Sequence, residues 1–143
     1  RDRSREVPQN ICDMNGVVFL ARITPNDSKT SKYSIRMTSG VFFDYIKRIK
    51  NTNKMVMILS VIRPKYSENI RVIKKRLIMI IKNLHQEKYM GYGSFQIDYD
   101  VYSTFMTYIN DIIDEFDCKP WISQSYHIDS DGIETCDCSS DIK

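Results

Sequence analysis

Apolar and polar positions along the chain repeat with two different periods, and these periods predict the elements of the fold. Residues 17–23 form an apolar run rich in β-branched side chains, and residues 33–37 alternate, so we expect two strands joined as a hairpin. The continuously apolar residues 55–61 predict a central strand covered on both faces, which Pro64 ends. The alternating residues 95–99 predict a short fourth strand with its aromatic side chains inward.

Three other segments repeat their apolar positions every three or four residues, which is the period of a helix with one buried face. The first spans residues 42–50 and carries basic residues in its last turn, where a helix C-terminus favours cations. The second spans residues 67–84, with Ser67 as a plausible N-cap. The third spans residues 102–116 and ends before Pro120.

These elements predict an α+β fold in which about three helices pack on a mixed β-sheet, in the order β-β-α-β-α-β-α-β. Residues 1–128 are expected to form a single globular domain whose last strand lies within residues 121–128. Residues 129–143 are acidic and rich in serine, so we expect a flexible C-terminal tail. The longest apolar runs, residues 55–62 and 77–81, are shorter than the roughly 20 residues of a transmembrane helix.

The residue usage and the cysteines bear on the origin of the chain. It begins without Met, which suggests a part of a longer polypeptide, and its single Ala beside many Ile, Lys and Asn residues suggests an AT-rich virus or protist as the source. Cys12, Cys118, Cys136 and Cys138 are too few for a disulfide scaffold, so reduced thiols in an intracellular setting are the simplest interpretation. A glycosylation acceptor at Asn26 leaves a secreted protein open.

The charges are divided unevenly along the chain, and this is its main functional clue. Residues 1–91 hold 19 Lys and Arg against 7 Asp and Glu, whereas residues 92–143 hold 2 against 11, so net charges of +12 and −9 lie within an overall +3. Such an asymmetry raises the expectation of nucleic acid, anionic lipid or an acidic protein as a partner.

Basic residues share one face of the second predicted helix, and we call this face the ridge. Its members are Arg71, Lys74, Lys75 and Lys82. Lys47 and Arg48 of the first helix are expected to extend the nucleic-acid-binding surface. Further residues can widen it if the element ends meet, namely Tyr33, Arg36, Lys50, Lys65 and Tyr66.

Two alternatives apply to the ridge. Its Lys and Arg side chains can simply solvate the outer face of a surface helix, and the acidic tail can fold back and neutralise them. Ile78 lies in the middle of the ridge by helical angle, and an apolar residue there suits a contact with another protein or with a neighbouring element of the chain.

Candidate metal ligands have ordinary structural alternatives. Asp98 and Asp100 face the same way if the fourth strand extends to them, and Asp111 lies on the next helix. Paired carboxylates can hold Mg²⁺ for phosphotransfer. The alternative is that Asp100 caps the third helix. A zinc site would draw on Cys118, His127, Cys136 and Cys138, whose spacing matches no zinc motif. No phosphate-binding loop or nucleophile motif occurs, so we assign no catalytic residue and no cofactor.

Aromatic residues cluster beside two glycines between the second and third helices. They are Tyr89, Tyr92, Phe95 and Tyr99. Exposed rings next to a basic helix can stack on unpaired bases. The alternative is a core of Phe95, Ile97 and Tyr99 with the other tyrosines capping the loop. The sequence thus favours a domain of a larger, possibly viral, polypeptide that binds RNA, single-stranded DNA or another polyanion. The alternatives are a protein-interaction module and a metal-dependent phosphotransfer enzyme that uses Asp98 and Asp100.

Overall fold

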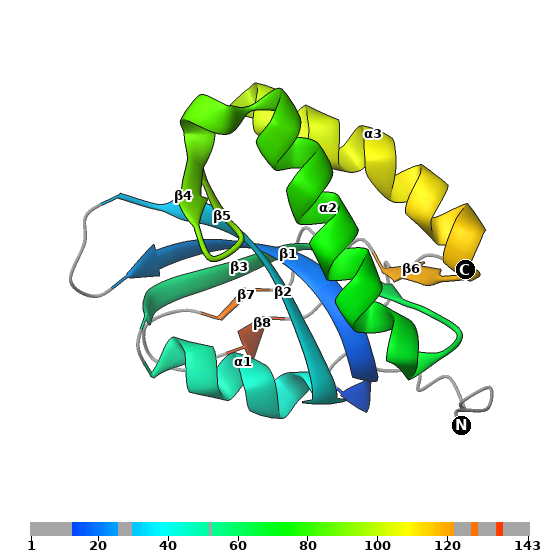
Figure 1. Cartoon of the computed structure of the whole chain (residues 1–143). Coiled ribbons are helices and arrows are strands. Elements are labelled where there is room, and N and C mark those ends of the chain that lie inside the picture. Colours follow the sequence, from blue (N-terminus) through cyan, green and yellow to red (C-terminus); the bar gives the residue numbers. More distant parts are fainter. Residues whose placement is uncertain (1–12, 26–29, 52, 122–126, 129–133, 136–143) are drawn as a thin grey trace.

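The computed structural model of the chain describes residues 13–25, 30–51, 53–121, 127–128 and 134–135 (Figure 1). The strands are β1 (Asn15–Pro25), β2 (Lys32–Val41), β3 (Asn53–Arg63), β4 (Tyr89–Gly91), β5 (Ser94–Gln96), β6 (Lys119–Trp121), β7 (His127–Ile128) and β8 (Glu134–Thr135). The helices are α1 (Phe42–Lys50), α2 (Ile70–Leu84) and α3 (Tyr99–Phe116), with short 3-10 turns η2 (Ser67–Asn69) and η3 (Gln86–Lys88).

The described strands form one sheet in the order β4-β5-β2-β1-β3-β7-β8, with β6 also paired to β3. The α+β fold and its three helices are therefore confirmed. The predicted mixed sheet is wrong in one respect, because every pairing between described strands is antiparallel. Helix α1 joins β2 to β3, and these two strands run in the same direction because both are antiparallel to β1. They do not pair with each other, because β1 lies between them in the sheet.

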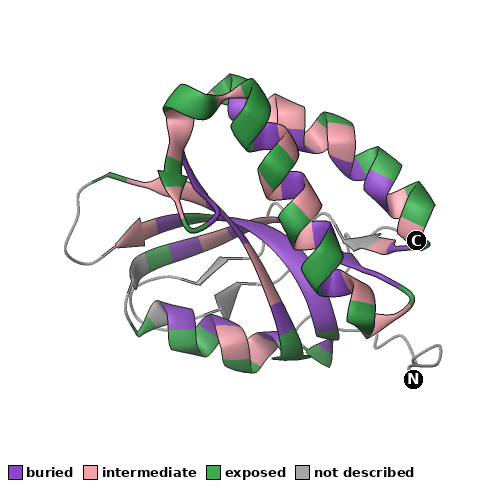
Figure 2. Ribbon diagram, viewed as in Figure 1, coloured by how far each residue is buried: buried purple, intermediate pink, exposed green. Residues whose placement is uncertain are grey.

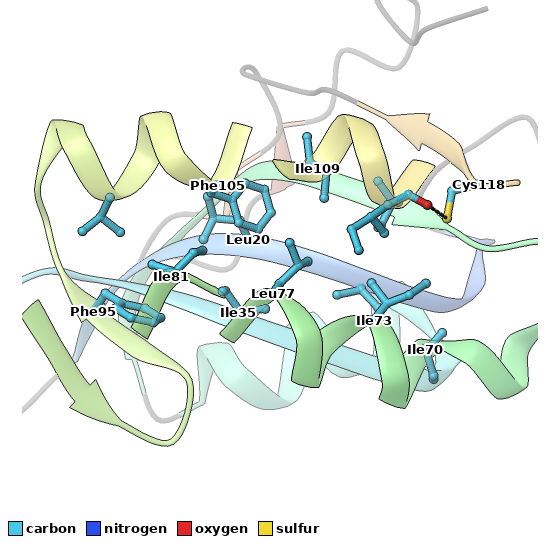
Figure 3. Close-up of a cluster of buried hydrophobic side chains, with 14 residues drawn as sticks. Leu20, Ile35, Ile70, Ile73, Leu77, Ile81, Phe95, Phe105, Ile109 and Cys118 are labelled. Carbon is cyan, nitrogen blue, oxygen red and sulfur yellow. Dashed lines mark hydrogen bonds between the residues drawn. The ribbon is translucent and has the colours of Figure 1, made fainter. Parts of the chain in front are cut away.

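Helices cover both faces of the sheet: α1 lies on one face, and α2 and α3 lie on the other (Figure 1). Because side chains alternate along a strand, β1 contributes Phe19 and Ile23 to the core beneath α1 and Leu20 to the core beneath α2 and α3. In the second core, Leu20 lies among Leu77 of α2 and Phe105 of α3 (Figure 3). Burial on both faces explains why β1 is apolar almost without interruption (Figure 2).

The predicted central strand, β3, lies beside the centre of the sheet, and β1 takes the middle position. The pairing of the two strands shifts where Leu20 lies opposite Ser60 and Ala21 lies opposite Ile58, which leaves one extra residue in β3. A bulge of this kind changes which face the following side chains occupy. Ile58 and Val61 therefore pack in the same core beneath α1, although they are an odd number of residues apart.

The segment between α2 and α3 differs from the prediction of one strand over residues 95–99. The chain forms a hairpin of β4 and β5, whose turn places Gly91, Tyr92 and Gly93 at positive φ angles. The strand then ends at Gln96, because the Asp98 carboxylate accepts a hydrogen bond of 2.7 Å from the Asp100 amide and starts α3 three residues earlier than predicted.

Of the last predicted strand, residues 121–128, the structure describes Trp121 at the end of β6 and the two residues of β7. Both β6 and β7 pair with β3. Within the predicted tail, β8 pairs with β7, and the remainder of residues 129–143 lies outside the described residues. The division into a domain and a tail thus stays a prediction. Among the described helices, none is long and apolar enough to cross a membrane.

Candidate nucleic-acid interface

The ridge runs along α2 from the side beside β2, where Lys74 lies near Arg36, to the exposed outer face. Four buried residues, Ile70, Ile73, Leu77 and Ile81, hold the helix against the sheet. Arg71, Lys75 and Lys82 are exposed, and Lys74 is partly buried beside the sheet. Arg71 and Lys82 are eleven residues apart, so the ridge is about 16 Å long at the rise of an α-helix.

The partly buried end of the ridge gathers three cations. The pKa of Lys74 lies below its usual value, first because burial disfavours its charged form and then because Arg36 and Arg71 repel it. Arg36 lies on β2, so the strand adds a fifth cation to the four of the ridge. This outcome agrees with the expectation that Arg36 can widen the basic surface.

Three acidic residues of α3 and its flanks pair with basic residues outside the ridge. Glu115 forms an ion pair with Arg76, whose guanidinium also lies 5.1 Å from the centre of the Phe116 ring. Arg76 is one residue beyond Lys75 and so points about 100° around the helix from it, toward α3. Two further ion pairs join Lys65 to Asp117 at 3.9 Å and Lys88 to Asp98 at 3.1 Å. Within the described part of the chain, no ridge cation forms an ion pair.

Ile78 contacts a neighbouring element of the chain, which was one of the two expectations for it. It packs against the core beneath α2 and α3, and a Cβ atom added to Gly93 would lie 3.0 Å from its Cδ1 atom. The β4-β5 turn therefore covers Ile78. At the far end of the ridge, the Lys82 ammonium lies 4.8 Å from the centre of the Tyr89 ring in the same hairpin.

The aromatic cluster divides between core and surface. Phe95 is fully buried and Tyr89 packs beside it with ring centroids 5.0 Å apart, so the core interpretation is right for Phe95. It is wrong for Ile97 and Tyr99, because both are exposed. Tyr92 is fully exposed at the tip of the hairpin that covers Ile78, and its φ angle of 54° is uncommon for a residue with a side chain. The Tyr92 ring is thus presented to solvent on the hairpin that covers Ile78.

Arg48 and Lys47, the two predicted residues of α1, point to different places. Arg48 and Arg71 line one pocket of about 430 Å³, although their helices cover opposite faces of the sheet. Lys47 does not line this pocket, and its ammonium lies 5.1 Å from the centre of the Phe43 ring. The other lining residues are Met37, Thr38, Ser39, Tyr45, Ser67, Glu68 and Ile70. Sequence reasoning missed this pocket, because no local pattern places the end of β2 between two helices.

Two of the predicted metal ligands, Asp98 and Cys118, take structural roles. Asp98, rather than Asp100, caps α3, and its carboxylate also binds Lys88, so both contacts hold the pKa of Asp98 below its usual value. Cys118 is buried and its thiol donates to the Ile112 carbonyl at 3.8 Å, while burial raises its pKa to about 12 (Figure 3). The described residues contain no group of three His, Cys, Asp or Glu side chains that could hold a metal ion. The other residues of the zinc hypothesis have no described side chains.

Comparisons of the chain with models of protein families, with curated proteins and with solved structures gave no match. Function must therefore follow from the chemistry of the surface itself. That surface combines five cations, one exposed tyrosine and an adjoining pocket with two arginines.

Proposed function

We propose that this domain binds single-stranded nucleic acid along the ridge. The observation that carries the proposal is the group formed by Arg36, Arg71 and Lys74, in which cations from a strand and a helix lie close enough to repel one another. On the α3 side of the same helix Arg76 pairs with Glu115, whereas no described ion pair involves a ridge cation. A polyanion on the ridge would relieve this repulsion.

Two properties of the surface favour a single strand over a duplex. The Tyr92 ring is fully exposed beside the ridge, and aromatic side chains stack on unpaired bases of any sequence. The contact of Lys82 with Tyr89 places a cation at the base of the same hairpin, where it can meet a phosphate next to a stacked base. A base-paired strand offers no free base face to such a ring.

Salt dependence of binding tests the electrostatic part of the proposal. If the four ridge cations and Arg36 each contact a phosphate, the slope of log affinity against log salt is about −3.5 for a single strand, so affinity falls by roughly 100-fold from about 50 to about 200 mM salt. The measurement is fluorescence anisotropy with labelled RNA and DNA oligonucleotides. A slope near zero would refute the proposal.

Charge reversal locates the binding surface. Lys75→Glu/Lys82→Glu should reduce the slope to about −2 and weaken binding at every salt concentration, because two phosphate contacts are lost. The matched control is Lys47→Glu/Lys119→Glu, which changes the net charge equally on α1 and on β6. Equal losses in both variants would mean that binding responds to net charge and not to the ridge.

Substitution of Tyr92 tests whether base stacking contributes to binding. Tyr92→Ala should weaken binding of single strands by between about 5-fold and about 100-fold, the loss expected for one stacked base. Tyr92→Phe keeps the ring and should bind nearly as well as the unmodified protein. If Tyr92→Ala binds normally, the ring is not part of the interface.

A protein-interaction role is the second candidate, and one observation favours it. Val72 and Met79 are 47% and 54% exposed on the outer face of α2, and they line a hollow of about 360 Å³ with Ile80. Lys75 and Arg76 also line it, which favours an acidic amphipathic helix as the partner. Met79→Ser should weaken such a complex at any salt concentration and leave nucleic-acid binding unchanged.

A further inference from the structure

The pocket between α1, β2 and the start of α2 opens at the edge of the sheet. Beside β2, strand β5 pairs only along Lys32, Tyr33 and Ser34, and the Ile35 amide donates the last hydrogen bond to the hairpin at 2.9 Å. Residues 37–39 therefore extend beyond the end of β5. Because α1 and α2 cover opposite faces, a pocket lined by both helices lies across this edge.

Two arginines line the pocket, Arg48 from α1 and Arg71 from α2. Arg48 lies with its guanidinium 5.2 Å from the centre of the Tyr45 ring, a contact that restrains its orientation. Among the described residues, neither Arg48 nor Arg71 forms an ion pair. Glu68 is the single carboxylate of the lining, so the pocket carries one net positive charge.

The remaining lining residues suit the oxygen atoms of a phosphate. Thr38 and Ser39 bring hydroxyl groups, and the Thr38 hydroxyl accepts a hydrogen bond from the Gly40 amide, so its proton stays available to a ligand. Guanidinium groups bind phosphate through paired N–H donors. The volume of about 430 Å³ falls within the range of small-molecule sites and is ample for a nucleotide.

We propose that this pocket binds a phosphomonoester, with Arg48 and Arg71 on the phosphate and Thr38 and Ser39 as hydroxyl donors. The phosphate can come from the end of a nucleic-acid strand or from a free nucleoside monophosphate. The assignment to a strand end rests on the proposed function: Arg71 belongs to both the ridge and the pocket, so a strand on the ridge would end there. An internal phosphodiester, which continues on both sides, fits a pocket less well than a terminal group.

The test compares oligonucleotides of one sequence with a phosphate at the 5′ end, at the 3′ end or at neither end, by anisotropy at fixed salt. One terminal phosphate should improve affinity by about tenfold, the effect of one additional charge-assisted contact. Arg48→Gln should abolish this preference. The matched control is Lys47→Gln, its exposed neighbour outside the pocket, which loses the same charge and should retain the preference. Glu68→Gln should strengthen the preference, because it removes the carboxylate that repels the phosphate.

Titration with a nucleoside monophosphate and with inorganic phosphate, followed by NMR shifts or calorimetry, separates the pocket from the ridge. The pocket proposal is supported if these small ligands bind to the unmodified protein and to Lys47→Gln but not to Arg48→Gln. If they bind in this way and no oligonucleotide binds, the pocket proposal stands and only the proposed nucleic-acid function fails. Equal affinity for all three oligonucleotides together with no response to either small ligand would overturn the pocket. A preference for terminal phosphate that persists in Arg48→Gln would also overturn it.

Discussion

Gly93 offers the sharpest test of how the β4-β5 hairpin supports the ridge. Its φ angle is +75°, and an added Cβ would lie 3.0 Å from the Ile78 Cδ1 atom and 3.1 Å from the Ile35 carbonyl oxygen. The Ile78 methyl group can rotate away. The carbonyl oxygen belongs to the backbone of β2, and its residue is held by the hydrogen bond from the Ile35 amide to Gly93. Substitution to Ala must therefore displace the hairpin from the strand.

The expected loss can be separated into two parts by a second glycine in the same turn. Gly91 has a φ angle of +93°, and nothing lies within 4 Å of its added Cβ. Gly91→Ala should therefore lower the free energy of unfolding by about 1–2 kcal/mol, the cost of a side chain in the left-handed region. Gly93→Ala carries the same cost and adds overpacking, which is about 1–3 kcal/mol. We expect a total of about 2–5 kcal/mol.

Urea unfolding followed by circular dichroism measures both variants. The expected result is a clearly lower midpoint for Gly93→Ala than for Gly91→Ala, with an unchanged denaturant dependence. Ile78→Ala alone should also destabilise the protein, because Ile78 packs against the core. The loss in Ile78→Ala/Gly93→Ala should therefore be smaller than the sum of the two single losses, and a loss from the Ile35 carbonyl should remain. Equal destabilisation of the two single variants would refute the contact between the hairpin and the ridge.

Three further predictions concern the α3 side. Cys118 should resist alkylation until urea unfolds the domain, and rapid labelling of the native protein would contradict its burial. Because burial raises the pKa of Cys118 from 9.0 to about 12, the free energy of unfolding should fall as the pH rises through that range. Asp98→Ala should lower the melting temperature more than Asp98→Asn, which can still cap α3, and identical melting curves would exclude a capping role. Because the Lys88 contact lowers the pKa of Asp98 from its usual 3.8, the stabilisation by the carboxylate should be complete above that pH and should be lost as the pH falls below it. Glu115→Gln should cost less than about 1 kcal/mol in thermal unfolding, since its ion pair with Arg76 is partly exposed, and a larger loss would show a buried contribution.

The repeating pattern of apolar residues was sufficient to predict the three helices and the three long strands. Leu77 and Ile81 illustrate why: a helix with one buried face must place apolar side chains at this spacing, whatever element it packs on. The same rule could not predict β4, because a strand of three residues is too short to show a repeating pattern of apolar and polar positions. It also extended the fourth strand too far, since a hydrogen bond from the Asp98 side chain, and not the alternation of residues 95–99, decides where α3 begins.

The sequence alone determined the uneven charge of the two halves and the basic face of α2, because composition and helical angle depend on neither topology nor packing. Only the tertiary structure decided which of these charges are balanced: Arg76 meets Glu115, whereas Lys74 meets Arg36. It alone placed Arg48 and Arg71 in one pocket, since their helices lie on opposite faces of the sheet and the pocket lies across the edge of β2 beyond the end of β5. The physical reason is that a residue's angle on its own helix is a local property, while its neighbours depend on contacts between segments that are distant along the chain.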